Sequence, residues 1–318
     1  MAERKVILAT DKAAIDADIQ AYVTYLKNST AEQYGKGSSD TLRVFCNALN
    51  KGGDRLSGIL TLEAYHMCGG KNRPMILQAA RAMEMIQAYL ALIDDNPEAA
   101  LLGNHAAMTI LANLDAPAEL RSNVLSITNR TLGVATHGRI ASHKQRTSTG
   151  KITPQILETD SSTPTILNPL HVGMVLAGAD CHATDAITPY ALALGQAFQI
   201  ADDIRSLFGD APRAGKSNLD NLREGKRTIL TIYTLKHASP KERQKLQYSV
   251  GNHQASTRDL TACLEIIRST GALKHGQVLI QSLKREAKQS LAQNKVYWDE
   301  AGQEFLYGFA DHARFSGI

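Results

Sequence analysis

Carboxylates gather at the end of one apolar stretch, in the segment Gln-Ile-Ala-Asp-Asp-Ile-Arg-Ser that begins at Gln199. Asp202, Ser206 and Asp210 are spaced i, i+4 and i+8, so a helix carries all three side chains on one face. Mg²⁺ prefers oxygen ligands and usually takes one or two carboxylates together with phosphates and waters. The stretch therefore predicts a magnesium site, with Asp203 beside it.

Two lysines follow the acidic stretch in polar, glycine-containing segments. Lys216 comes directly after a glycine, and Lys226 lies in the sequence Arg-Glu-Gly-Lys-Arg-Thr. Ammonium groups suit phosphate oxygens and stabilise the negative charge that develops on a leaving group. Carboxylates and lysines together predict a site for a magnesium-bound phosphate ester. We expect Lys216, Lys226 and Gln199 to act in catalysis, with Gln199 orienting a metal-bound group one turn before Asp202.

A second acidic cluster ends an earlier apolar stretch and contains Asp94, Asp95 and Glu98. Pro97 has no N–H to donate, so we expect it to kink or end the helix there. A solitary Asp-Asp pair at a helix end is usually a solvated face. Two such clusters, followed by the lysines, instead favour several magnesium ions held against one diphosphate.

The segment 198–230 resembles the second aspartate-rich region of the trans-isoprenyl diphosphate synthases, the polyprenyl synthetase family. That region reads Gln-Ile-x-Asp-Asp-x-x-Asp-x-x-Gly-Asp, then Gly-Lys, then Asp-Leu-x-Glu-Gly-Lys-x-Thr. Residues 52–56 are similar to the family's Gly-Gly-Lys-Arg-Leu, and residues 84–95 to the helix that carries its first aspartate motif. The resemblance extends from residue 51 to the end of the chain.

The resemblance implies an all-α fold, with residues 1–318 forming a single large helical bundle of the isoprenoid synthase type around a central cavity. It also implies several Mg²⁺ ions, an allylic prenyl diphosphate as substrate, isopentenyl diphosphate as the family's acceptor, and a homodimer. The expected metal ligands are Asp94, Asp95, Glu98, Asp202, Asp203, Ser206 and Asp210. The expected substrate contacts are Arg55, Gln87, Tyr89, Lys216 and Lys226. A bulky side chain at the position of Tyr89 shortens the product in the family, although a tyrosine there is also an ordinary core residue.

The family's acceptor site is largely missing from this chain. In the family, basic groups near the first glycine pair, a histidine, and an arginine pair after the first motif hold isopentenyl diphosphate. The corresponding positions are occupied here by Asp54, Ser57, Gln87, Leu101 and Leu102. Only Arg55 remains, and each lost charge-assisted hydrogen bond removes roughly 1.5–3 kcal/mol. Ser206 also replaces the family's third aspartate, which gives a spacing similar to the metal triad of class I terpene synthases.

Three functions therefore remain open. The first is a prenyltransferase that ionises an allylic diphosphate and passes a short prenyl group to an acceptor. The second is a terpene synthase or diphosphate lyase that does not use isopentenyl diphosphate. The third is a non-catalytic partner subunit of a prenyl synthase, although a silent subunit has no need to retain two acidic clusters.

Composition narrows the class of protein. The 318 residues, 43% of them hydrophobic and 21% charged, suffice for one large domain. A net charge of +4 and a single Trp argue against a nucleic-acid surface. The four cysteines show no Cys-x-x-Cys spacing and are typical of reduced thiols. With no apolar signal region and no run of about 18 apolar residues, we expect a soluble, cytoplasmic protein.

Helical periodicity dominates the chain, and no alternating strand pattern is present. The expected helices are residues 15–26, 42–49, 74–93, 118–143, 166–179, 187–208, 227–237, 257–270 and 274–292, with a last one at 296–315. The segments 29–40 and 142–165 are polar and rich in Gly, Ser and Thr, so we expect loops or helix ends there.

Overall fold

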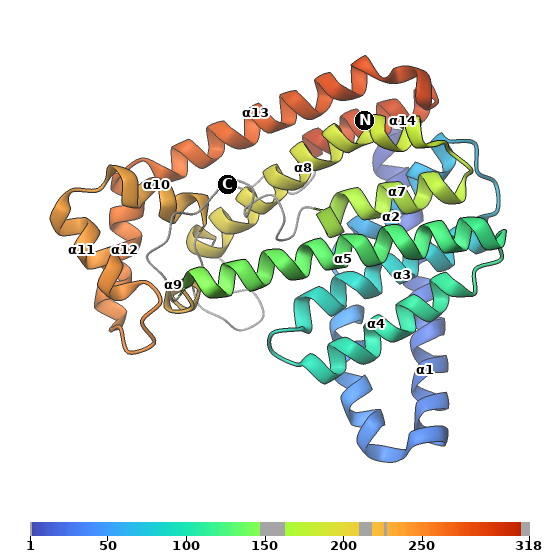
Figure 1. Ribbon diagram of the computed structural model, residues 1–318, viewed down its shortest axis with the longest axis horizontal. Coiled ribbons are helices and arrows are strands. Elements are labelled where there is room, and N and C mark those ends of the chain that lie inside the picture. Colours follow the sequence, from blue (N-terminus) through green and yellow to red (C-terminus); the bar gives the residue numbers. More distant parts are fainter. Residues whose placement is uncertain (1, 147–162, 210–217, 226–227, 313–318) are drawn as a thin grey trace. The chain divides into compact units, whose positions relative to one another are not determined.

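The computed structural model describes residues 2–146, 163–209, 218–225 and 228–312 (Figure 1). Its regular elements within these ranges are all helical, which confirms the expected all-α class. The α-helices are α1 Ala2–Asn50, α2 Leu56–Met67, α3 Arg73–Leu92, α4 Pro97–Ala112, α5 Ala118–Arg146, α7 Asn168–Leu176, α8 Cys181–Phe208, α9 Asn218–Arg223, α10 Ile229–His237, α11 Pro240–Ser249, α12 Thr257–Ser269, α13 Ala272–Gln293 and α14 Glu300–His312. A π-helical turn, Thr163–Leu167, leads into α7.

The chain divides into two compact units. The first unit comprises Met1–Leu132, Pro164–Thr188 and Leu291–Leu306, and the second comprises Gly133–Thr163, Pro189–Ser290 and Tyr307–Ile318. Helix α8 contributes to both units, because the boundary falls inside it, at Pro189. The expectation of a single domain around a central cavity stays a prediction.

Helix α2 forms the centre of the first unit and is buried on nearly all sides, with Leu60, Leu62 and Ala64 fully inaccessible. It packs against α3 and α7. Gly173 of α7 faces the backbone of α2, where a Cβ would collide with the carbonyl oxygen of Thr61. A glycine at this position therefore lets the two helices approach closely.

The expectation of a loop or helix end at residues 29–40 was wrong, because this segment lies inside helix α1. The segment is helical up to and beyond a kink at Gly35, whose φ of 76° and ψ of −170° are non-helical. Figure 1 shows the chain turning back on itself within α1. Tertiary contacts override the weak local propensity, since both arms bury apolar side chains such as Ile19 and Phe45. The Gln20 amide also donates to Asn50 Oδ1 across the arms at 3.0 Å.

The periodicity does not predict α2, α4 or α11. Buried residues lie on most sides of α2, so it lacks the polar face that periodicity detects. Helix α11 is mainly polar, and the signal that identifies it is its start. Ser239 and Glu242 form a capping box there, and Pro240 occupies the first helical position.

Helices α8, α10 and α13 meet in the second unit. Gly276 of α13 lies against Ile204 of α8 and Leu230 of α10, and a Cβ on it would stand 3.1 Å from a methyl group of each. Thr228 starts α10 with a capping box that it forms with Thr231. This cap fixes the backbone at Thr228, two residues after Lys226 in the sequence.

Glu63 of α2 is surrounded by charged groups from other parts of the first unit. Burial, followed by the hydrogen bond and charge of Asp11 and the charge of Asp299, raises the pKa of Glu63 to about 8. Arg73, which pairs with Asp11 at 3.2 Å, opposes the shift. Glu63 therefore carries a proton in the folded protein at neutral pH, which it loses when the chain unfolds.

This proton makes stability depend on pH. A carboxyl group whose folded pKa lies above its unfolded value contributes fully below about pH 4.5, and the contribution is lost as pH rises through about 8. We expect the free energy of unfolding to fall by roughly 2–4 kcal/mol more between pH 5 and pH 9 in the wild type than in Glu63→Gln. Urea unfolding at several pH values measures this difference. Glu265→Gln, at an exposed site, is the control and keeps the wild-type slope; an equal slope in Glu63→Gln contradicts the assignment.

Candidate functional site

The second half of α8 carries the acidic pair predicted as the metal site. Asp203 is only 3% exposed, and its Oδ1 accepts a hydrogen bond from Gln199 Nε2 at 2.9 Å, one turn earlier. Asp202 is more accessible and accepts from Arg205 Nη1, also at 2.9 Å. The pair is thus divided, with one carboxylate buried and oriented by an amide and the other accessible to solvent.

Both carboxylates lie near the C-terminal end of α8, where the helix dipole is negative. Negative side chains are unfavourable at this end unless a cation compensates them, and Arg205 is such a cation for Asp202. Carboxylate oxygens in such a field suit a hard divalent cation. The donor types present on α8 therefore fit magnesium.

Two asparagines fix the end of this helix. Asn221 Nδ2 donates to the carbonyl oxygen of Ser206 at 2.9 Å, and Asn218 Nδ2 donates to that of Gly209 at 3.1 Å. The Ser206 hydroxyl donates to the carbonyl oxygen of Asp203 at 2.9 Å. Ser206 lies one turn after Asp202 on the same helix, as predicted. The sequence analysis did not identify Asn218 or Asn221 as residues of the site.

Three of the predicted site residues, Asp210, Lys216 and Lys226, lie outside the described residues. Within the ranges that the structure describes, no three His, Cys, Asp or Glu side chains are grouped closely enough to hold a metal ion. A magnesium ion at Asp202 therefore needs other oxygen ligands, such as the phosphates and waters that it commonly takes.

The segment before Lys226 is held by a close backbone contact. Gly225 and Gly251 both have positive φ, 70° and 82°, and a Cβ on Gly225 would lie 2.7 Å from the Cα of Gly251. The N–H of Gly251 donates to the carbonyl oxygen of Leu222 at 2.8 Å. The glycine of the Glu-Gly-Lys motif therefore allows the turn between α11 and α12 to pack directly against the backbone of the motif.

The first acidic cluster lies in the connection between α3 and α4. Helix α3 ends at Leu92 and α4 begins with Pro97, so the break lies at residues 93–96 and the proline takes the first position of the next helix. The side chains of Asp94, Asp95 and Glu98 are exposed. This cluster belongs to the first unit, whereas Asp202 belongs to the second. It stays a prediction that the first cluster binds a metal ion and that the two clusters act on one diphosphate.

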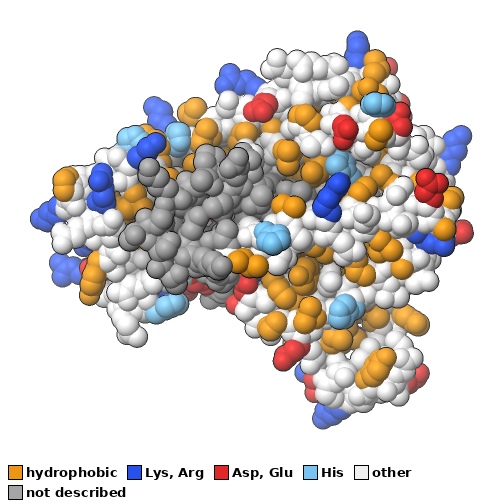
Figure 2. Space-filling model, in the orientation of Figure 1, with side chains coloured by type: hydrophobic (Ala, Val, Ile, Leu, Met, Phe, Trp, Pro, Cys, Tyr) orange, Lys and Arg blue, Asp and Glu red, His pale blue; other side chains and the backbone are white. Residues whose placement is uncertain are grey.

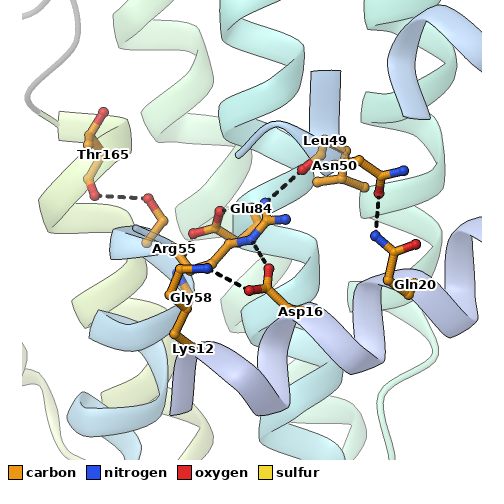
Figure 3. A network of polar contacts seen from close by, with 10 residues as sticks. Lys12, Asp16, Gln20, Leu49, Asn50, Arg55, Gly58, Glu84 and Thr165 are labelled. Atoms are coloured by element: carbon orange, nitrogen blue, oxygen red, sulfur yellow. Dashed lines mark hydrogen bonds and ion pairs between the residues drawn. The ribbon is translucent and has the colours of Figure 1, made fainter. Parts of the chain in front are cut away.

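Arg55, predicted to contact substrate, folds back into the first unit (Figure 3). Its backbone has a φ of 54°, and it is the only non-glycine residue with positive φ in the described part of the chain. A Cβ on Gly52 would collide with its guanidinium, and Gly53 has a φ of 57°. The glycine pair therefore provides the space and the turn that bring the arginine inward.

The buried guanidinium is bound by three partners. Its Nε donates to Asp16 Oδ1 at 2.7 Å, and its Nη1 donates to the Leu49 carbonyl oxygen at 2.7 Å and to Glu84 Oε2 at 3.4 Å. Glu84 also accepts from the N–H of Gly58 at 2.8 Å. Figure 3 shows Asp16 and Glu84 pointing toward Arg55 from α1 and α3. Arg55 thus links α1, α2 and α3.

Gln87 and Tyr89 lie on α3, as expected. The Gln87 amide donates to the Pro164 carbonyl oxygen at 3.0 Å and accepts from Thr165 Oγ1 at 3.1 Å. Ser57 Oγ also reaches this segment and donates to the Thr165 carbonyl oxygen at 3.2 Å. Tyr89 is half-buried in the last turn of α3, and its influence on product length stays a prediction.

Comparison with solved structures identifies the fold. The fold is that of a geranylgeranyl pyrophosphate synthase from Corynebacterium glutamicum, solved with isoprenyl diphosphate and magnesium, at 22% identity and a TM-score of 0.83 over 96% of this chain and 98% of that one. The fold is also that of a polyprenyl synthase from Caulobacter crescentus, solved with calcium and isoprenyl diphosphate. The two chains are 22% identical, with a TM-score of 0.79 over 100% of this chain and 98% of that one. The chain has the all-α fold of the isoprenyl synthases.

Sequence comparison then identifies the family. The polyprenyl synthetase model matches residues 96–267, more than half of the chain. The chain belongs to the polyprenyl synthetase family.

Individual relatives match over shorter segments. Geranylgeranyl diphosphate synthase of Saccharolobus solfataricus is 36% identical over 120 residues, 36% of each chain. Octaprenyl diphosphate synthase of Escherichia coli is 29% identical over 137 residues, 43% of this chain and 41% of its own. The alignments thus span well under half the length of these relatives.

Nothing in the described part of the chain is both long and apolar enough to form a membrane-spanning helix. The four cysteines are free thiols, with Cys46 and Cys263 buried. The cytoplasmic location stays a prediction.

Removing the Arg55 side chain tests its role in the fold. Arg55→Ala leaves the buried Glu84 and the adjoining Asp16 without their shared cation, and we expect a loss of about 3–5 kcal/mol in the free energy of unfolding. Urea denaturation measures the loss. Arg43→Ala, which breaks an exposed pair with Asp40, is the control and should cost less than about 1 kcal/mol. Equal costs for the two variants contradict the structural role.

Proposed function

We propose that this chain ionises an allylic prenyl diphosphate and transfers the short prenyl group to an acceptor, in the manner of the isoprenyl diphosphate synthases. The carboxylate arrangement on α8 is the observation that carries the proposal. Asp203 is fixed by Gln199, while Asp202 stays accessible at the negative end of the helix. Family membership supports the same reaction.

These carboxylates would hold magnesium, which would supply positive charge for a departing diphosphate. Asp202, Asp203 and Ser206 of α8 are the proposed ligands in the second unit, joined by Asp210. Asp94, Asp95 and Glu98 are the proposed ligands of the first cluster. Several ions are proposed because two clusters are present.

The chain's own residues have separate tasks in this proposal. Gln199 holds the Asp203 carboxylate in one orientation, and Asn221 holds the last turn of α8. Lys216 and Lys226 add positive charge for the phosphate oxygens of the leaving group. A carbocation also needs an apolar surrounding that excludes water until the acceptor reacts. Tyr89 is the proposed limit on chain length.

The proposed assembly is a homodimer, in line with the family resemblance. Figure 2 shows apolar side chains among the polar ones in the region of α4. Leu101 and Leu102 of α4 are 46% and 37% exposed. A second copy that covers these side chains would remove them from water.

Replacing Asp202 tests the proposed function. Asp202→Asn keeps the shape of the side chain but removes the charge that holds the cation, so we expect diphosphate release from farnesyl diphosphate to fall roughly a hundredfold or more. Phosphate detection after pyrophosphatase treatment, with Mg²⁺ present, measures release.

Asp220→Asn is a matched control. Asp220 pairs with Arg223 at i, i+3 and 2.8 Å, much as Asp202 pairs with Arg205. This variant loses a similar ion pair and should retain wild-type release. Full activity in Asp202→Asn, or no release from the wild type with any allylic diphosphate, contradicts the proposed function; the latter outcome favours a non-catalytic partner subunit.

A further inference from the structure

Arg205 lies within the acidic stretch of α8 and is paired with the more accessible of its two aspartates. Arg205 Nη1 donates to Asp202 Oδ1 at 2.9 Å, and each of the two side chains is 26% exposed. The two residues are spaced i, i+3, so one helix carries both ends of the pair. The carboxylate that we propose as a magnesium ligand therefore already has a cation of the chain itself beside it.

The two aspartates of α8 are oriented by different kinds of donor. Asp203 accepts from the neutral amide of Gln199, whereas Asp202 accepts from a charged guanidinium. A neutral amide fixes a carboxylate without offsetting its charge, while a guanidinium offsets the charge that attracts a metal ion. A divalent cation that approaches Asp202 therefore competes with Arg205.

The pair between Arg205 and Asp202 is of a kind that exchanges partners readily. Ion pairs between partly exposed side chains of one helix are weak, so a metal ion can replace the arginine at little cost. Arg205 belongs to the last turn of α8, where the negative end of the helix dipole favours a cation. This dipole keeps the guanidinium close to the site after the pair has separated.

A diphosphate is a suitable second partner for Arg205. The planar guanidinium presents several N–H donors and can bind phosphate oxygens in a bidentate manner. A metal diphosphate at Asp202 would bring both the cation that replaces Arg205 and the anion that Arg205 can bind next. Metal ion and diphosphate together therefore satisfy this end of α8 better than the metal ion alone.

We propose that Arg205 couples the binding of magnesium to the binding of diphosphate at the α8 carboxylates. In the ligand-free chain it offsets the charge of Asp202 and weakens the binding of a metal ion alone. When a metal diphosphate binds, Arg205 leaves Asp202 and donates to the phosphate oxygens. The inference rests on the proposed function, because it concerns how the same site takes up the diphosphate group of the substrate.

Metal binding by the ligand-free chain is the first test. Electron paramagnetic resonance measures Mn²⁺ binding to the wild type and to Arg205→Gln, which removes the charge. We expect the variant to bind Mn²⁺ roughly three- to tenfold more tightly, because Asp202 has lost its cation. Arg223→Gln is the matched control and should bind Mn²⁺ like the wild type. Arg223 pairs with Asp220 at i, i+3 and 2.8 Å, and its side chain is 28% exposed.

Diphosphate binding must change in the opposite direction. Inorganic pyrophosphate is titrated calorimetrically into each folded protein in excess Mg²⁺, and we expect Arg205→Gln to bind it at least roughly tenfold more weakly than the wild type. Arg205→Lys keeps the charge but loses the planar fork, so it should bind Mn²⁺ like the wild type and pyrophosphate with intermediate affinity. Unchanged affinities in Arg205→Gln, or weaker binding of both ligands, overturn the inference.

The same measurements separate this inference from the proposed function. If Asp202→Asn abolishes binding of magnesium pyrophosphate but Arg205→Gln keeps both wild-type affinities, only the inference fails. If the wild type binds neither Mn²⁺ nor magnesium pyrophosphate, or Asp202→Asn leaves both affinities unchanged, the proposed function fails as well.

Discussion

The guanidinium of Arg55 lies buried where α1, α2 and α3 meet, and the arrangement of the first unit depends on how its charge is satisfied. A buried cation is tolerated only when it is paired and fully hydrogen-bonded. Asp16 and Glu84 supply the charges from two other helices, and the Leu49 carbonyl oxygen adds a third acceptor. The same pairing keeps the arginine side chain only 3% exposed.

The second unit holds its acidic pair differently. Asp202 and Asp203 lie near the C-terminal end of α8, where the helix dipole is negative. Arg205 compensates one carboxylate locally, and Gln199 orients the other. The two units therefore differ in burial: Arg55 is enclosed in the first unit, whereas Asp202 in the second is partly accessible and is the carboxylate that we propose as a metal ligand.

Local patterns explain what the sequence predicted well. The all-helical class, the course of α8 and a break in the helix near Pro97 follow from periodicity and from the chemistry of single residues. The difference in burial between Asp202 and Asp203 could not be predicted, because both are aspartates and only tertiary packing buries one of them. The pairing of Arg55 with Asp16 joins residues 39 positions apart, and no local pattern marks it. The hairpin in α1 also depends on distant burial rather than on propensity.

A crystal structure of the full chain with Mn²⁺, farnesyl thiodiphosphate and isopentenyl diphosphate tests the central claim most directly, because one experiment observes both charge arrangements. The account predicts manganese and the thiodiphosphate beside Asp202, with Arg55 still bound to Asp16 and Glu84. A thiodiphosphate bound without manganese at Asp202 would contradict it.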